Sequence, residues 1–228
     1  MILLLLPGLL CDARLWRDCV PAGAEARIAY LAHDDSMAAM AGRALALVAD
    51  APRFAVAGLS MGGYVALEVM RQAAARVSHL ALLDTSARAD AEEQTRRREA
   101  LIALAQTGRF RGVTPRLLPQ LVHPSRLDTP LAAEVTAMAE RIGQDGFLRQ
   151  QRAIMARPDS RPDLPGIAVP TLVGVGEADV LTPPELAEEM ATLIPGAQLV
   201  RFPGCGHLPP MENPAATTAL LRDWLAGR

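Results

Sequence analysis

The six residues Gly58-Leu59-Ser60-Met61-Gly62-Gly63 directly follow a short apolar run at 54–57. Glycine, serine and glycine at this spacing predict a sharp strand-to-helix turn that presents Ser60. Such a turn holds the serine backbone in a strained conformation, and a side chain at Gly58 or Gly62 would collide with the adjacent strand or helix. The cost of that strain favours a chemical role for Ser60 over an incidental serine.

A nucleophilic serine needs a histidine that takes its proton and a carboxylate that orients the histidine. His207, the last of four histidines, lies in a glycine-rich loop after the apolar stretch 198–202. Asp179 follows the buried strand expected at 171–176, at the carboxyl end where functional loops of open α/β sheets lie. Ser60, Asp179 and His207 therefore form one hypothesis of a catalytic triad, in the chain order Ser, Asp, His.

A second carboxylate competes for the acid position of this triad. Asp84 ends the strand expected at 80–84, and an acid at that place would serve the same histidine. We favour Asp179 because of its loop context.

The oxyanion of a tetrahedral intermediate needs two preorganised N–H donors. The backbone N–H of Met61 is expected to be one, because it follows the nucleophile. The second is expected from the loop after the strand at 2–6, and we assign it to Leu9. Gly8 lets this backbone approach the substrate.

The chain resembles the α/β-hydrolase superfamily, and within it the small esterases, lactonases and C–C hydrolases. The resemblance spans nearly the whole chain and rests on Leu6-Pro7-Gly8-Leu9 with Trp16, on 58–63, on Gly176-Glu177-Ala178-Asp179, and on Gly206-His207 followed by Glu212-Asn213-Pro214. Relatives usually carry His-Gly at Pro7-Gly8, so a side chain that commonly braces the oxyanion loop is absent here. Relatives also usually begin with a two-strand hairpin, whereas the first strand here starts at Ile2, so we expect a sheet shortened to six parallel strands.

Strands alternate with helices at both ends of the chain, which is typical of a parallel sheet covered on both faces. Strands are expected at 2–6, 27–32, 54–57, 80–84, 171–176 and 198–202. Helices are expected at 37–50, 61–75, 182–193 and 215–226. The helix at 182–193 begins with a capping box at Thr182-Pro183-Pro184-Glu185, and Asn213-Pro214 caps the last helix. From 86 to 165 strands disappear, and helical runs are expected at 91–106, 115–121, 131–142 and 145–156. We therefore expect an α/β-hydrolase core of 1–85 and 166–228, with a helical cap or lid inserted at 86–165.

Composition excludes some functions and leaves others open. Half of the residues are hydrophobic and the net charge is −2, so no electrostatic footprint indicates nucleic acid or an anionic membrane as a partner. Cys11, Cys19 and Cys205 are an odd number without metal spacing, which favours reduced thiols, and no residue cluster has ligand spacing. We expect no metal and no cofactor.

The apolar start of the chain imitates a short signal peptide, but it has no basic residue and Pro7-Gly8 interrupts it. No apolar stretch is long enough to span a bilayer. We therefore interpret the start as a buried strand and expect a cytoplasmic protein.

These observations predict a cofactor-free serine hydrolase of small carboxylic esters or lactones. Lactones are included because of the resemblance to enol-lactone hydrolases. Three alternatives stay open: C–C cleavage or elimination with Arg96-Arg97-Arg98 holding a substrate carboxylate, acyl transfer to another acceptor, and a non-catalytic ligand receptor. The partner is expected to be a small molecule, and the exposed edge of a short sheet leaves a homodimer open.

Overall fold

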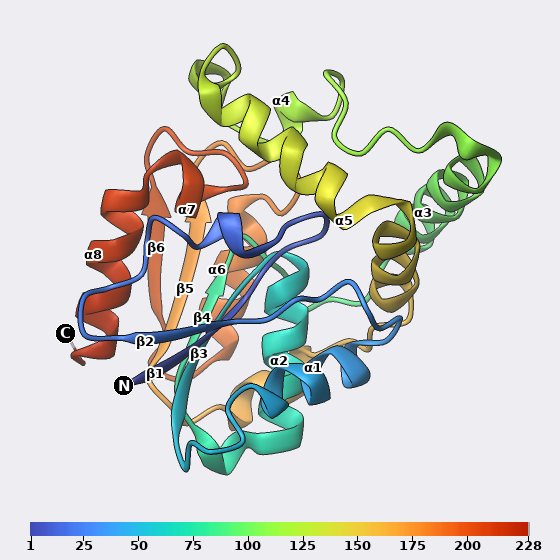
Figure 1. Cartoon of the computed structure of the whole chain (residues 1–228). Coiled ribbons are helices and arrows are strands. Elements are labelled where there is room, and N and C mark those ends of the chain that lie inside the picture. Colours follow the sequence, from blue (N-terminus) through green and yellow to red (C-terminus); the bar gives the residue numbers. More distant parts are fainter. Residues whose placement is uncertain (228) are drawn as a thin grey trace.

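A fully parallel six-stranded sheet forms the centre of the computed structural model, which describes residues 1–227 (Figure 1). The strand order is β2-β1-β3-β4-β5-β6. The strands are β1 (Ile2–Leu6), β2 (Glu25–Ile28), β3 (Phe54–Leu59), β4 (Val77–Leu83), β5 (Thr171–Gly176) and β6 (Gln198–Phe202). The six-stranded parallel sheet expected from the sequence is confirmed.

The second strand begins earlier than the sequence analysis expected. β2 pairs with β1 from Glu25, opposite Ile2, to Ile28, opposite Leu5. The N–H of Ala29 still donates to Leu5 O at 2.9 Å, after which the chain leaves the sheet. Residues 29–32 are mostly buried, so their apolar character reflects packing and not pairing.

Helices cover both faces of the sheet, as the alternation of strands and helices predicts. Outside the central helical segment they are α1 (Met37–Ala46), α2 (Met61–Ala73), α6 (Pro184–Leu193), α7 (Pro209–Glu212) and α8 (Pro214–Leu225), with short η1 (Ala13–Leu15) and η2 (Ala74–Arg76). Leu4 and Leu6 of β1 point into a core with α1, α2 and α6. Leu3 and Leu5 point into a second core with α8. Because successive side chains of a strand point to opposite faces of the sheet, β1 contributes to both hydrophobic cores.

The chain between β4 and β5 is helical throughout its regular structure. It contains α3 (Glu92–Leu104), η3 (Ala105–Arg109), α4 (Leu118–Leu121), η4 (Pro124–Arg126), α5 (Pro130–Met155) and η5 (Arg161–Gly166). Figure 1 shows α3, α4 and α5, in green to yellow, along the upper and right-hand part of the molecule. The two helices expected at 131–142 and 145–156 form one element, interrupted at Gly143, where φ is 69°.

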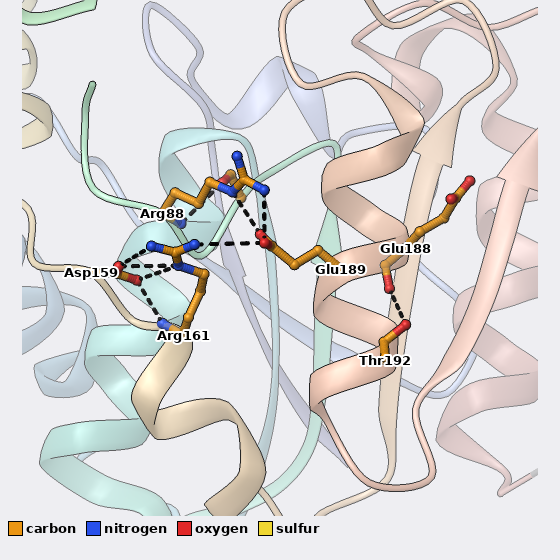
Figure 2. Close-up of polar contacts among 7 residues, drawn as sticks. Arg88, Asp159, Arg161, Glu188, Glu189 and Thr192 are labelled. Carbon is orange, nitrogen blue, oxygen red and sulfur yellow. Dashed lines mark hydrogen bonds and ion pairs between the residues drawn. The ribbon is translucent and has the colours of Figure 1, made fainter. Parts of the chain in front are cut away.

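Polar contacts join both ends of this helical segment to α6 (Figure 2). Arg88, shortly after β4, donates two hydrogen bonds to the Glu189 carboxylate, at 2.8 and 2.9 Å. Arg161, near the other end, lies 3.7 Å from the same carboxylate and is paired with Asp159. Exposed ion pairs each stabilise a folded protein by about 1 kcal/mol or less. These contacts therefore contribute little to stability and mainly connect the two ends of the helical segment to α6.

Within residues 1–227, no helix combines the length and the apolar character that crossing a bilayer requires.

Candidate active site

Ser60 occupies the sharp turn between β3 and α2, with φ 56° and ψ −117°. This backbone conformation is unfavourable for a residue with a Cβ atom, and such strain persists only where the surroundings enforce it. The N–H of Ser60 donates to Leu83 O at 2.9 Å, and its carbonyl accepts the Thr85 hydroxyl at 2.7 Å. The end of β4 therefore holds the strained turn in place.

The two glycines that flank the serine leave no room for a side chain. A Cβ atom at Gly58 would lie 2.1 Å from Gly62 O, and one at Gly62 would lie 2.0 Å from Leu6 O. Both distances are far inside van der Waals contact, and both partners are backbone atoms. The close approach that the motif predicted at these two positions is confirmed.

Asp179 and His207 form a buried hydrogen-bonded pair. The Nδ1 atom of His207 lies 2.8 Å from Asp179 Oδ2, and the two residues are 4% and 2% exposed. Asp179 follows β5 and His207 follows β6, while Ser60 follows β3, so all three lie at the carboxyl ends of parallel strands. Asp179 and His207 are 28 residues apart in the sequence, and they meet because β5 and β6 are neighbours in the sheet.

The Asp179 carboxylate is held by its own loop as well as by the histidine. Oδ1 accepts the N–H groups of Leu181 and Thr182 at 2.8 and 3.1 Å, and Oδ2 accepts the Thr182 hydroxyl at 2.7 Å. Burial alone would raise the pKa of Asp179, but the charge of His207 and the hydrogen bonds from His207 and Thr182 outweigh it and leave this pKa below its ordinary value. The pair is thus built to keep a charged carboxylate behind the imidazole.

The capping box expected at Thr182-Pro183-Pro184-Glu185 is wrong in one respect. α6 begins with proline at Pro184, but its N-cap is Pro183 and no side chain caps it. The Thr182 hydroxyl is committed to Asp179 instead. The residue that a local pattern assigned to helix capping therefore serves the site.

Asp84 lies beside the pair rather than away from it. Donor and acceptor atoms of Asp84, Asp179 and His207 all lie within 4.8 Å of one another. Asp84 is fully buried in the left-handed region at φ 45°, its Oδ1 accepts the N–H of Gly176 at 2.8 Å, and its Oδ2 has no partner among the described residues. Burial first, and then the negative charge of Asp179, raise the pKa of Asp84 well above its ordinary value.

Three such groups in one place could also hold a metal ion by distance alone. The carboxylate oxygens already have partners within the protein: Asp84 Oδ1 accepts the N–H of Gly176, and Asp179 Oδ2 accepts the Thr182 hydroxyl. The His207 Nδ1 atom is already bonded to Asp179. The residues therefore favour a hydrogen-bonded network over a metal centre.

The loop after β1 approaches the serine turn, as the assignment of Leu9 requires. A Cβ atom at Gly8 would lie 3.3 Å from Leu59 O and 3.4 Å from Ser60 Cβ, so the backbone of the loop lies directly against the turn. The N–H of Leu9 has no hydrogen-bond partner in the part of the chain that the structure describes. Met61 is the first residue of α2, where backbone N–H groups lack partners within the helix.

Glu212 is a buried residue of the site to which sequence reasoning gave no role. Its Oε1 accepts the N–H groups of Gly206 and Leu208, at 2.9 and 3.1 Å, on either side of His207. The N–H of His207 donates to Leu121 O, in the helical segment, at 3.0 Å. The signal in the sequence was a glutamate shortly after the histidine, but a residue pattern does not show that its partners are backbone amides.

Two other groups singled out in the sequence have structural partners. Arg98 donates to Asp90 at 2.7 Å and to Gln151 at 2.8 Å, so it is not free for a substrate carboxylate. Cys205 is buried, and burial raises the pKa of its thiol to about 12, which favours an inert thiol.

The chain matches a known family model and is similar to proteins of known name. A model of the alpha/beta hydrolase family matches residues 3–220. The chain is 30% identical over 194 residues to a pimeloyl-(acyl-carrier protein) methyl ester esterase of Neisseria meningitidis serogroup B (strain H44/76), covering 83% of this chain and 75% of that protein.

Two solved structures share the fold over nearly all of the chain. A thermophilic esterase from Thermogutta terrifontis with malate bound is 30% identical with a TM-score of 0.87, covering 100% of this chain and 90% of its own. The enol-lactonase from Burkholderia xenovorans LB400 is 25% identical with a TM-score of 0.87, covering 99% and 91%.

Proposed function

Because this chain belongs to the alpha/beta hydrolase family, we propose that it is a serine hydrolase of small carboxylic esters or lactones. The observation that carries the proposal is the buried 2.8 Å pair of Asp179 and His207 at the sheet edge that also carries Ser60. A buried histidine bonded through Nδ1 to a carboxylate leaves Nε2 to exchange a proton with a nucleophile.

In this mechanism the Ser60 hydroxyl attacks the substrate carbonyl while His207 Nε2 takes its proton. Asp179 stabilises the imidazolium that results, and its lowered pKa supports a charged carboxylate at neutral pH. The N–H groups of Leu9 and Met61 bind the oxyanion, and the positive end of the α2 dipole adds to the field there. His207 then protonates the departing alcohol, and water releases the acid from the acyl-enzyme by the reverse proton transfers.

The proposed substrate class rests on the names of the similar proteins. The relatives described above are named as a methyl ester esterase, an esterase and an enol-lactonase. Ester and lactone hydrolysis share the same attack and the same oxyanion, so one site suits both. The contacts of Arg98 with Asp90 and Gln151 count against the C–C alternative in which this arginine holds a substrate carboxylate.

We further propose that residues 86–165 act as a lid over the site. Two contacts support this: His207 N–H donates to Leu121 O, and the N–H of His123 donates to Glu212 at 2.7 Å. Both join the helical segment to the loop of the proposed general base. A lid in this position would exclude water from the acyl-enzyme until the alcohol has left.

The test is hydrolysis of p-nitrophenyl acetate, butyrate and octanoate, with γ-butyrolactone and an enol-lactone in parallel. Ser60→Ala is expected to lower kcat by about 10⁴-fold or more. Ser125→Ala, at an exposed serine of the helical segment, is the matched control and is expected to keep wild-type activity.

Retention of most activity in Ser60→Ala would refute the serine mechanism. Failure of the folded wild type on all five substrates would refute the substrate class. Acidic dicarbonyl substrates, added alcohol acceptors and a fluorophosphonate probe of Ser60 then separate C–C cleavage, acyl transfer and a receptor.

A further inference from the structure

The loop that carries Leu9 has little side-chain support of its own. Residues 7–10 are proline, glycine and two leucines, which offer no polar side-chain atom. The neighbouring Cys11 adds one weak contact, because its thiol, a poor donor, lies 3.5 Å from Leu9 O. Within the loop, the N–H of Cys11 donates to Gly8 O at 3.1 Å, which closes a turn with Leu9 and Leu10 at its centre. Leu10 adopts φ 59° in this turn.

This turn is strained and needs support from outside. Positive φ at the third position of a turn normally requires glycine or asparagine, and leucine there costs on the order of 1–2 kcal/mol. The alternative is rotation of the peptide group between Leu9 and Leu10, which would relieve the strain and change the shape of the loop. An oxyanion donor must hold its position closely to act.

Gln150 supplies a hydrogen bond at this peptide group. It lies in α5, is fully buried, and its Oε1 accepts the N–H of Leu10 at 3.0 Å across 140 positions of the chain. Its Nε2 donates to Leu31 O at 3.2 Å, so both ends of the amide are used. A buried amide with both ends bonded has one orientation, and that orientation fixes the Leu9–Leu10 peptide.

A second contact connects the same helix with the chain just after the loop. Arg141 of α5 pairs with Asp12 through Nε and Nη2. Asp12 in turn accepts the N–H of Arg14 at 2.9 Å and caps η1. α5 therefore contacts the loop at Leu10 and its exit at Asp12.

We propose that Gln150 is a positioning residue that holds the oxyanion loop in its reactive shape, and that it links the helical segment to catalysis. Its catalytic consequence rests on the function proposed above. Gln150 touches neither substrate nor the reacting atoms and acts through Leu10 and Leu9. Gln150 thus supports the loop from the helical segment, because residues 7–10 have no polar side chain and the Cys11 thiol is only a weak donor.

The test compares Gln150→Met with Gln151→Met. Methionine has nearly the same length and no amide, and Gln151 is the adjacent buried glutamine of α5, bonded to Arg98 and not to the loop. Displacement of one oxyanion donor costs about 10²-fold in kcat. We expect Gln150→Met to lower kcat about 10- to 100-fold with KM changed less than about 3-fold, and Gln151→Met to leave kcat within about 2-fold.

Hydrogen exchange of the Leu10 amide gives a readout that does not depend on activity. It is expected to speed up in Gln150→Met and to stay at the wild-type rate in Gln151→Met. Gln150→Glu serves if the methionine variant does not fold. At this fully buried position the protonated carboxyl is favoured, and it keeps the length, an acceptor oxygen for the Leu10 N–H and an O–H donor for Leu31 O, so Leu10 exchange is expected to remain slow.

Equal loss of kcat in both methionine variants would overturn the proposal, because a general loss of packing would then explain it. Unchanged Leu10 exchange in Gln150→Met, or fast exchange in a folded Gln150→Glu, would also overturn it. If the wild type proves inactive while Leu10 exchange responds as expected, the proposed function fails and the brace itself stands.

Discussion

Glu212 and His123 are joined by a 2.7 Å hydrogen bond from the His123 backbone N–H to Glu212 Oε2, across 89 positions of the chain. The other carboxylate oxygen binds the amides on either side of His207. One buried side chain thus connects the loop of the proposed general base to the helical segment. The position of His207 depends on this carboxylate as well as on Asp179.

Glu212→Gln is therefore expected to destabilise the protein and to lower kcat. A glutamine amide has one acceptor oxygen in place of two, so at least one of the three N–H groups, two of them in buried hydrogen bonds, loses its partner, at a cost of about 1–3 kcal/mol. The melting temperature is expected to fall by about 2–4 °C for each kcal/mol of lost free energy of unfolding in a chain of this size. Glu99→Gln, at an exposed glutamate of α3, is the control, and equal melting temperatures for the two variants would contradict the prediction.

The sequence predicted the sheet well because its strands carry local signals. β1, β3 and β5 are apolar runs bounded by glycine or proline, and their burial on both faces leaves little other interpretation. The two helices predicted at 131–142 and 145–156 form the single element α5, and the non-helical Gly143 lies between the two predicted runs. The predicted strand at 27–32 was wrong at both ends. The charged Glu25 gave no strand signal although it pairs with β1, and the apolar residues 29–32 are mostly buried without pairing as a strand.

Replacement of the two neighbouring acids separates their roles. Asp179→Asn is expected to lower kcat by about 10⁴-fold, as the same change does in the Ser-His-Asp template. Asp84→Asn is expected to keep kcat within about 3-fold, because asparagine retains the acceptor for Gly176 and tolerates positive φ. Ester hydrolysis measures both, and loss of activity in Asp84→Asn alone would make Asp84 the triad acid.

The raised pKa of Asp84 predicts how stability depends on pH. The unfolded chain loses this proton near pH 3.9, whereas the folded protein holds it to higher pH, so the stability linked to Asp84 is complete below about pH 3.9 and falls as pH rises through the folded pKa. Asp84→Asn stays neutral, so the melting temperature of the variant minus that of the wild type should increase from pH 4 upward. A gain on the order of 1 kcal/mol corresponds to about 2–4 °C.

The other charged groups around Asp84 are common to both proteins. Asp179, Glu212 and His207 lie around its carboxyl and are present in wild type and variant alike. Asp179 acts in the opposite direction, because its lowered pKa gives stability that is lost as pH falls. Only the difference between the two proteins therefore reports Asp84, and a difference that does not change between pH 4 and pH 9 would contradict the raised pKa.

The candidate site shows where sequence reasoning ends. Ser60, Asp179 and His207 stand at strand ends, so local motifs and the rule for parallel sheets were enough to suggest them. Glu212 binds two backbone amides close to it in the sequence and a third 89 positions away, and Gln150 binds a backbone amide 140 positions away. A backbone amide leaves no mark in a sequence, so contacts of this kind are visible only in the folded chain.

The serine turn gives the sharpest test of local geometry, by comparison of Gly62→Ala with Gly42→Ala. A Cβ atom at Gly62 would lie 2.0 Å from Leu6 O, and the partner is a backbone atom of a central strand that cannot move aside. We expect a loss of about 3 kcal/mol or more, together with loss of activity. At Gly42, inside α1, the nearest atom is Gln72 Oε1 at 4.0 Å, so alanine is expected to stabilise the helix by about 0.5–1 kcal/mol. Thermal unfolding of both variants tests this prediction. A lower melting temperature for Gly62→Ala and a higher one for Gly42→Ala would support the geometry of the turn. Equal, small changes in the two melting temperatures would mean that the turn at Ser60 tolerates a side chain and is not strained.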